Sequence, residues 1–282
     1  MGKKDVPVED KLAYYLLKGM NKAIREYGMI ADGDRIAVAV SGGKDSLTLL
    51  HLLRLRQKSV AEKYQIVAIH VDMRSPEGVP CWGADTHEGL KNYLEAQGQE
   101  FSWETIRAQS PESCFRCAHL RRKAIFLAAQ RLNCSRIATG HHADDAAQTT
   151  LLNLIFHGQA ETLHPQREFF AGQLVLIRPL IYLQEKEIAR FAQAMAFPVI
   201  PAGCPHHAAS RRALVKDLIR NLERQYPKVK INLVRAGLRG LQRRENLDLR
   251  SDAPHDESGE TFASDPQEPP TTRHPQHKKE GS

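Results

Sequence analysis

The sequence predicts an α/β fold with helices on both faces of a doubly wound, mostly parallel sheet. Two observations lead to this prediction. Short, β-branched apolar segments such as 36–40 and 66–71 are typical of strands that are buried on both faces. Longer segments with apolar residues at helical spacing alternate with these strands, which is the pattern of βαβ units.

The predicted elements follow one another in a regular order. Apolar residues at helical spacing from Leu12 to Tyr27 predict an amphipathic N-terminal helix. Strands are expected at 36–40, 66–71, 101–106, 136–139 and 174–177, and helices after 46, around 89–96, from 113, through 151–155 and over 185–197. The helix from 113 should bury Leu120, Ala124 and Leu127, and loops are expected at 73–83 and 157–172.

The segment 41–46 connects the first strand to the helix that follows it. It consists of Ser41, Gly42, Gly43, Lys44, Asp45 and Ser46. Its glycines let a phosphate chain approach the backbone, and the start of the helix attracts negative charge. Lys44 and the serine hydroxyls can add direct phosphate contacts. The spacing is not that of a Walker A loop. We predict a phosphate-binding loop of another type, and the alternative is an ordinary glycine-rich turn.

Two later strands also end in residues that can bind a ligand. Asp72 comes directly after the strand 66–71, and Gly140 and Asp145 follow the strand 136–139. In open α/β sheets, ligands bind outside the carboxyl ends of the strands, where a carboxylate can hold a metal ion or a ribose. The alternatives are a solvated carboxylate at 72 and a helix cap at 140–145.

The cysteines suggest metal or sulfur chemistry. Cys114 and Cys117 lie three residues apart at the start of a predicted helix, so they project from one side of it, with Arg121 one turn later. The helix dipole stabilises thiolates at this position. Cys204, in a loop constrained by prolines, is a third candidate. Five cysteines with one Cys-x-x-Cys pair do not suggest a disulfide framework. Cys81 is expected to be incidental and Cys134 to be buried.

The segment after residue 208 is strongly basic. Residues 211–244 contain eleven lysines and arginines and only two acidic residues, a net charge of +9. Arg212, Lys216 and Arg220 recur every four residues along a predicted helix. The apolar side of this helix is expected at Leu214, Leu218 and Leu222. A solvated helix face would mix the signs of its charges, so a polyphosphate partner is favoured.

Composition divides the chain into four parts. Residues 251–282 contain only three apolar residues, so we expect this tail to be disordered. The tail carries seven acidic and three basic residues, which leaves a net charge of +11 on residues 1–250, compared with +7 for the whole chain. Such a balance favours a polyanionic partner, or serves solubility alone. The parts are an N-terminal helix (1–30), a nucleotide domain with the cysteine site (31–205), a basic helical extension (206–248) and an acidic tail (249–282).

Neither a membrane span nor a signal peptide is visible in the sequence. There is no run of about 18 apolar residues, and the N-terminus has no apolar core of the kind that a secretion signal requires. We therefore expect a soluble, cytoplasmic protein with no membrane partner.

Taken together, these motifs resemble the TtcA family, the tRNA 2-thiocytidine synthetases of the PP-loop ATP-pyrophosphatase superfamily. The resemblance extends from about residue 12 to residue 238 and rests on SGGKDS, CFRCAHLRR, GHHADDAAQTTLLNLIFHG, LIRPL, EKEIARFA and FPVIPAGC. It implies an adenine nucleotide alpha hydrolase-like fold. Family members often carry a second cysteine shortly before the last cysteine, where this chain has the residues 201–203, Pro-Ala-Gly.

The resemblance also implies an activity and its cofactors. ATP with Mg²⁺ would adenylate the C2 oxygen of a cytidine in the tRNA anticodon loop, at position 32 in the family. Pyrophosphate would leave, and sulfide would then displace AMP to give 2-thiocytidine. By matched position, Cys114, Cys117 and Cys204 would hold a [4Fe-4S] cluster whose fourth iron, free of protein ligands, can carry sulfur. Candidate Mg²⁺ contacts are Asp45, Asp72 and Asp145, in that order.

Further roles follow from the same resemblance. Lys44, Asp45 and the three cysteines would be catalytic, and the hexapeptide with Asp72, Gly140 and Asp145 would bind the nucleotide. The expected partners are tRNA, a cysteine desulfurase or another sulfide donor, and a second copy of the chain, since a dimer is common in such proteins. The expected tRNA-binding residues are Arg121, Arg122, Arg211, Arg212, Lys216 and Arg220.

Other interpretations remain open at this point. The three cysteines with His206 or His207 would form a closed Cys₃His zinc centre, although zinc ribbons usually supply two Cys-x-x-Cys pairs. A tRNA lysidine synthetase shares the loop but needs no cysteine cluster. The related thiouridine synthetases carry an N-terminal cysteine pair, whereas residues 1–80 contain no cysteine. A non-catalytic tRNA-binding or iron–sulfur-sensing module would not need an intact loop and carboxylates.

Overall fold

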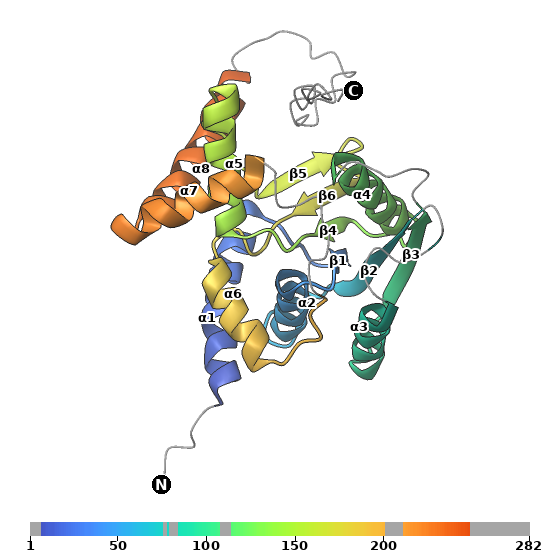
Figure 1. Ribbon diagram of the computed structural model, residues 1–282. Helices are drawn as coiled ribbons and strands as arrows, with labels where there is room; N and C mark the ends of the chain where they lie inside the picture. The colour runs from blue at the N-terminus through green and yellow to red at the C-terminus, as the bar shows by residue number, and fades with distance from the viewer. Residues whose placement is uncertain (1–6, 76–77, 79–83, 108–113, 201–210, 249–282) are drawn as a thin grey trace, which may run out of the picture.

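The computed structural model describes residues 7–75, 78, 84–107, 114–200 and 211–248. At its centre lies a six-stranded sheet in the order β3-β2-β1-β4-β6-β5 (Figure 1). All neighbouring strands run parallel except β5, which pairs antiparallel with β6. The strands are β1 (Arg35–Ala39), β2 (Gln65–Arg74), β3 (Phe101–Arg107), β4 (Arg136–Ala138), β5 (Gln166–Phe169) and β6 (Leu174–Ile177). The predicted fold class is confirmed.

Helices cover both faces of the sheet because its central strands alternate apolar side chains between the faces. In β1, Ile36 and Val38 pack into the larger core, whereas Ala37 packs with α4 on the opposite face. The helices of the described chain are α1 (Val8–Tyr27), α2 (Lys44–Gln57), α3 (Ala84–Ala96), α4 (Cys114–Arg131), α5 (Ala143–His157), α6 (Glu185–Ala194), α7 (Arg211–Gln225) and α8 (Val229–Asp248).

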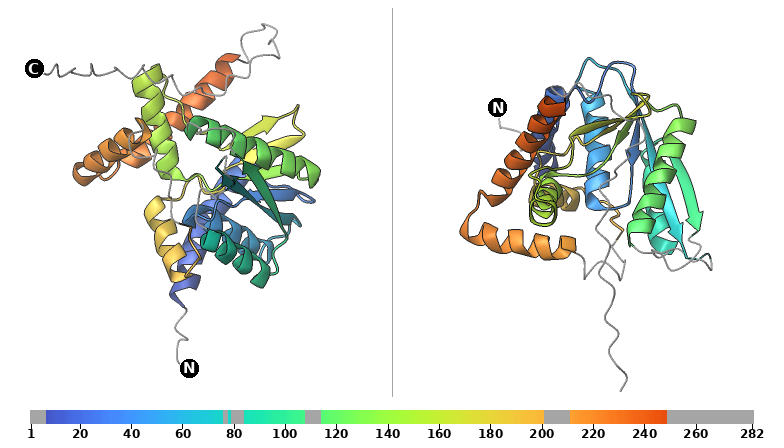
Figure 2. Two further views of the ribbon diagram at one scale, coloured as in Figure 1. Left: turned by 45° about the vertical axis from the view of Figure 1, so that its right-hand side comes forward. Right: turned by 90° about the horizontal axis from the view of Figure 1, so that it is seen from above.

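The larger core joins α1, α2 and α6. The amphipathic pattern of α1 is realised, with Leu16, Met20 and Ala23 buried. Phe191 of α6 is fully buried, and its ring lies 5.6 Å from His51 of α2. Figure 2 shows α7 and α8 beside α5, at the side of the sheet away from α3. No helix in the described part of the chain is long and apolar enough to span a lipid bilayer.

The segment 157–172, which we expected to be a loop, contains strand β5. Its sequence, Gln-Arg-Glu-Phe, has no apolar alternation to predict a strand. The strand instead pairs with β6 along the sheet edge, from Gln166 opposite Ile177 to Phe169 opposite Leu174. The Phe169 ring also contacts that of Phe126 on α4, with a centroid distance of 4.9 Å. Tertiary pairing therefore overrides a weak local signal.

Two helices bury a different side from the one we expected. In α4, Leu127 is 56% exposed, and the adjacent Ala128 and Ala129 pack on the sheet instead. In α7, Leu214 and Leu218 are exposed, and Val215 and Ile219 are buried. Both helices have apolar residues on adjoining stripes, so periodicity alone left the orientation of each helix ambiguous. In α4, the small side chains of the two alanines let the helix lie close to the sheet.

Two leucines of the predicted helices test these assignments. Replacing Leu53 of α2, which is fully buried, with alanine should lower the free energy of unfolding by about 2–5 kcal/mol, because it removes apolar contacts and leaves a cavity. The matched change Leu127→Ala on α4 should cost within about 0.5 kcal/mol. Urea denaturation of both variants measures the difference. Equal losses would contradict the orientation of α4.

Candidate active site

The phosphate-binding loop predicted at 41–46 lies between β1 and the first turn of α2. Its serines hold it in shape, since Ser46 Oγ donates to the Gly43 carbonyl at 2.9 Å and the Ser41 amide donates to Ser46 Oγ at 3.2 Å. Gly42 has a φ of +81°, and a Cβ there would lie 2.4 Å from the Ile200 side chain. The Ile200 amide donates to the Gly42 carbonyl at 2.9 Å. The segment after α6 thus packs directly on the loop.

The end of β4 lies against the start of α2. A Cβ on Gly140 would come within 3.0 Å of the backbone of Asp45 and Ser46, so only glycine fits without displacing the loop. This contact lies where the strand order reverses between β1 and β4, the usual ligand site of an open α/β sheet.

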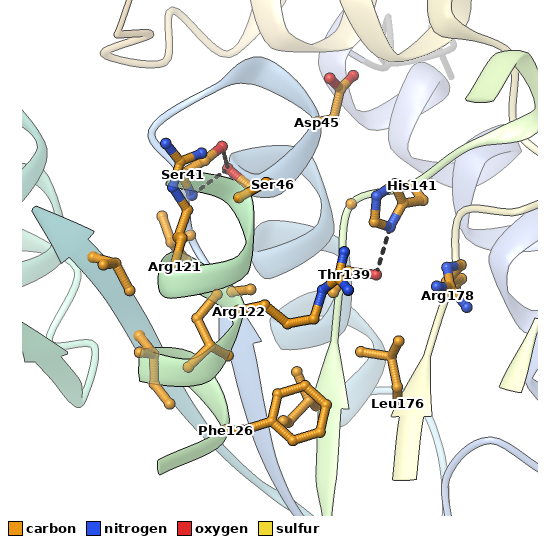
Figure 3. A pocket seen from close by; sticks show the side chains of 18 of the residues that line it. Ser41, Asp45, Ser46, Arg121, Arg122, Phe126, Thr139, His141, Leu176 and Arg178 are labelled. Atoms are coloured by element: carbon orange, nitrogen blue, oxygen red, sulfur yellow. Dashed lines mark hydrogen bonds between the residues drawn. The ribbon is translucent and has the colours of Figure 1, made fainter. Parts of the chain in front are cut away.

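A cavity of about 530 Å³ opens at this place (Figure 3). It brings together seven of the residues that the sequence singled out: Ser41, Asp45, Ser46, Gly140, Asp145, Arg121 and Arg122. Apolar side chains from the strands and α4, such as Ile69, Val71 and Phe126, form another part of its wall. The cavity also includes His141, from the segment after the strand 136–139, and Arg167 and Arg178, which sequence reasoning missed. The position of Arg178 directly after a strand was the available signal.

Lys44 points toward acidic side chains at the edge of the loop. Its Nζ lies 3.3 Å from Asp45 Oδ2 and 3.1 Å from Glu185 Oε1. Burial acts to lower the pKa of Lys44, but the charges of Asp45 and Glu185 outweigh burial and raise the pKa above its usual value. Glu185 Oε2 in turn lies 3.4 Å from Lys216 Nζ. Glu185, another residue that sequence reasoning missed, therefore links the loop to α7.

His142 lies among three carboxylates. Its Nε2 is 3.7 Å from Asp45 Oδ1 and 3.5 Å from Asp145 Oδ2, and its Nδ1 is 3.8 Å from Asp144 Oδ2. Asp144 also accepts a hydrogen bond from the Glu185 amide at 2.7 Å and thereby caps α6. Burial raises the pKa of Asp45, although His142 and Lys44 act in the opposite direction.

Asp72 does not line the loop cavity. The strand β2 continues past residue 71 to Arg74, so Asp72 lies within it and faces away from the side on which Val71 lines the cavity. Its Oδ2 lies 2.8 Å from Arg74 Nε, and its Oδ1 lies 3.4 Å from His87 Nδ1. These residues line a separate hollow of about 350 Å³. The predicted nucleotide-binding role of Asp72 gains no support from this position.

The structure describes only some of the cysteines. Cys114 begins α4, and Cys117 follows one turn later and is half-buried. Cys204, His206 and His207 lie outside the described residues, as does the side chain of Cys114. Cys134 is buried, as expected. Within the described ranges, no three histidine, cysteine or acidic side chains are arranged to hold a metal ion.

The basic residues of α7 divide into two groups. Arg212 Nη2 lies 3.6 Å from Asp145 Oδ1, and Lys216 pairs with Glu185, so both reach the acidic edge of the cavity. Arg211 instead lies over the Phe156 ring, and Arg220 pairs with Asp217 of its own helix at 2.8 Å in an exposed position.

Comparison with known proteins identifies the class and then the family. Residues 16–200 match the PP-loop domain family, so the chain is a PP-loop protein. It is 38% identical over 252 residues to a tRNA-cytidine(32) 2-sulfurtransferase of Geobacter sulfurreducens, a match that covers 85% of this chain and 95% of that relative. The corresponding protein of Geotalea uraniireducens is also 38% identical, over 86% of this chain and 98% of its own. The chain therefore belongs to the tRNA-cytidine(32) 2-sulfurtransferase family, and the predicted family is confirmed.

A solved structure agrees on the fold. The U34-tRNA thiolase NcsA from Methanococcus maripaludis, determined with its [4Fe-4S] cluster, superimposes with a TM-score of 0.67 and 24% sequence identity. The match covers 83% of this chain and 80% of that one.

The link from Lys44 through Glu185 to Lys216 predicts the effect of one substitution. Glu185→Gln removes a carboxylate that competes with phosphate for Lys44, so the affinity for ATP should rise roughly fivefold at low salt, which corresponds to about 1 kcal/mol for a half-buried ion pair. Isothermal titration calorimetry measures the affinity.

The control for this experiment is Glu187→Gln on the same helix. Glu187 accepts a hydrogen bond from the Gln184 amide at 3.0 Å and caps the helix. This variant should bind ATP like the unchanged protein. Unchanged or weaker ATP binding by Glu185→Gln would show that Glu185 does not compete for Lys44.

Proposed function

We propose that this chain is a tRNA-cytidine 2-sulfurtransferase that adenylates the C2 oxygen of cytidine 32 in the anticodon loop and replaces that oxygen with sulfur. One observation carries the proposal. The helix turn after Cys117 supplies Ala118, Arg121 and Arg122 to the wall of the same cavity that the phosphate-binding loop lines. The helix that carries Cys114 and Cys117 thus borders the place where a nucleotide would be activated.

The loop supplies the chemistry of adenylation. The carbonyl oxygen of a pyrimidine is a poor leaving group, so it must first become part of a phosphate ester. The amides at the start of α2, the hydroxyls of Ser41 and Ser46 and the ammonium of Lys44 would hold the β- and γ-phosphates while pyrophosphate departs. The 2-oxygen of the cytidine would attack the α-phosphate.

Asp45 and Asp145 would hold the Mg²⁺ that accompanies ATP. Both line the cavity beside the loop. Asp45 Oδ1 is buried and accepts no hydrogen bond from the described residues, and a bound cation would compensate this oxygen. The cation would neutralise charge on the phosphates as the bond to pyrophosphate breaks. The apolar wall formed by Ile69, Val71 and Phe126 has the character needed to hold a planar base.

The three cysteines would hold an iron–sulfur cluster beside the cavity. Cys114 and Cys117 start the helix that lines the cavity. Cys204 comes four residues after Ile200 in the sequence, and Ile200 packs on the loop. A [4Fe-4S] cluster held by these three thiolates would supply an iron without a protein ligand that can bind sulfide.

The basic helices provide a surface for tRNA. The stripe of Arg212, Lys216 and Arg220 runs along α7, the helix that also contacts the active-site carboxylates. Phosphates bound there would place the anticodon loop near the cavity. A cysteine desulfurase or another sulfide donor, and a second copy of the chain in a homodimer, belong to the same proposal.

Cysteine substitutions should separate the two half-reactions. Cys114→Ala and Cys204→Ala should each reduce 2-thiocytidine formation on the order of 100-fold, because sulfide loses its site, yet leave tRNA-dependent release of pyrophosphate. Lys44→Met should reduce pyrophosphate release itself by a similar factor. Mass spectrometry of tRNA nucleosides and a pyrophosphate assay measure the two steps.

Cys81→Ala is the matched control for these variants, because no role is proposed for that thiol, and both steps should proceed at the normal rate. Thiolation that persists in Cys114→Ala would remove the cysteines from the mechanism. If neither the unchanged protein nor any variant releases pyrophosphate, with or without tRNA, the proposed adenylation step would be wrong.

The metal content decides between a cluster and a zinc centre. Protein purified without oxygen should contain about four iron and four acid-labile sulfide atoms per chain, and Cys117→Ser should lose both. Elemental analysis and visible absorption measure this. One zinc and no iron would make the cysteines structural and would leave an adenylating enzyme whose nucleophile is not sulfur.

A further inference from the structure

Arg178 is a buried cation with no carboxylate partner among the residues that the structure describes. It comes directly after β6, is 9% exposed and lines the loop cavity. One guanidinium nitrogen, Nη1, donates to the His164 carbonyl, whereas Nε is buried without any hydrogen-bond partner. Among the described residues, no acidic side chain forms an ion pair with it. A buried charge in this situation is costly unless a ligand compensates it.

Other positive charges near Arg178 make an anionic ligand more favourable at this place. Arg122 of α4 and Arg167 of β5 line the same cavity. Burial, and then the charges of these two arginines, lower the pKa of Arg178 to about 10, so it stays protonated at neutral pH. His141 beside it is neutral, because burial and the charge of Arg178 lower its pKa to about 3. The nearest acidic influence is Asp145, which is also in contact with Arg212.

This cluster is separate from the phosphate-binding loop. In Figure 3, Arg178 lies across the cavity from Ser41 and Ser46, beyond Thr139 and His141. Thr139 Oγ1 and His141 Nδ1 are hydrogen-bonded at 2.9 Å, which fixes the ring between the two sides. The arginines come from α4 and from the β5–β6 edge of the sheet, whereas the loop belongs to β1 and α2.

We propose that Arg178, together with Arg122 and Arg167, forms a second phosphate-binding subsite of the cavity, which takes a phosphodiester of the RNA strand next to the reacting nucleotide. A planar guanidinium with an unsatisfied donor matches phosphate oxygens, which accept two parallel hydrogen bonds. The loop already provides for the phosphates of ATP. Arg167 is exposed, so the subsite is open to a strand that approaches from solvent. The RNA source of the phosphate rests on the proposed function, whereas the anion subsite itself does not.

The test compares Arg178→Gln with Arg190→Gln in the full chain. Arg190 is exposed on α6 and lies outside the cavity, so its substitution removes one charge without touching the site. The affinity for an unmodified tRNA transcript is measured by fluorescence anisotropy at several salt concentrations, and the affinity for ATP by calorimetry. Arg178→Gln should weaken tRNA binding roughly tenfold and reduce the salt slope by about one, whereas ATP binding and Arg190→Gln should be unchanged.

Two further variants keep the result interpretable if Arg178→Gln is unstable. Arg178→Lys retains the charge but not the planar donor, and should recover only part of the affinity. Arg167→Gln is exposed and does not endanger the fold, and it should weaken tRNA binding severalfold. Melting temperatures establish that each variant is folded.

The outcomes separate the possible sources of the phosphate. Weaker ATP binding with normal tRNA binding would overturn the RNA assignment and give the subsite to the nucleotide. Normal affinity for both ligands in folded Arg178 and Arg167 variants would overturn the subsite altogether. Since these measurements read binding, a wild-type protein that binds tRNA through Arg178 but forms no 2-thiocytidine would contradict the proposed function alone.

Discussion

The close packing of β4 against the start of α2 is the constraint on which the site depends. Gly140 leaves no room for a side chain between the two elements, so the end of one strand and the N-terminus of the loop helix are held in van der Waals contact. That contact aligns the amides of α2 with the carboxyl ends of β1 and β4, where the strand order reverses. Ile200 then covers the other side of the loop through Gly42. The loop is thus fixed from two sides by segments that are distant in the sequence.

Charge balance extends this arrangement to the C-terminal helices. Glu185 contacts both Lys44 and Lys216, and Asp145 contacts Arg212, so ion pairs link α7 to the active site in addition to the buried Val215 and Ile219. Such pairs are sensitive to any polyanion that binds either partner. If a phosphate binds Lys44, Glu185 would pair only with Lys216. If a phosphate binds Lys216, Glu185 would pair only with Lys44. Lys44 and Lys216 share this one carboxylate, so binding of a phosphate at either lysine would affect the other lysine.

Much of this could be predicted from the sequence, because the strongest signals are local. The apolar strands, the loop at 41–46 and the carboxylates after β4 lie in continuous segments whose position follows from strand and helix order. The misses depend on tertiary contacts. Strand β5 exists because β6 offers a partner, and Leu127 is exposed because alanines bring α4 closer to the sheet. Asp72 faces the opposite side because β2 extends beyond the predicted end and a strand alternates its side chains. Glu185 acquires its significance from Lys44, which lies 141 residues earlier in the chain. Arg178 acquires its significance from residues of other elements, such as Arg122 of α4 and Asp145 of α5.

The cavity has two edges of opposite chemistry, and this division suits a reaction that must bring two polyanions together. Asp45 and Asp145 at one edge can hold a cation, whereas Arg122, Arg167 and Arg178 at the other edge present positive charge. ATP would arrive with Mg²⁺ at the acidic edge, and an RNA phosphate would need the cationic one. Repulsion between the triphosphate and the RNA backbone would otherwise oppose their approach. The two proposed phosphate sites, with neutral His141 between them, would let the base reach the α-phosphate while the charges stay apart.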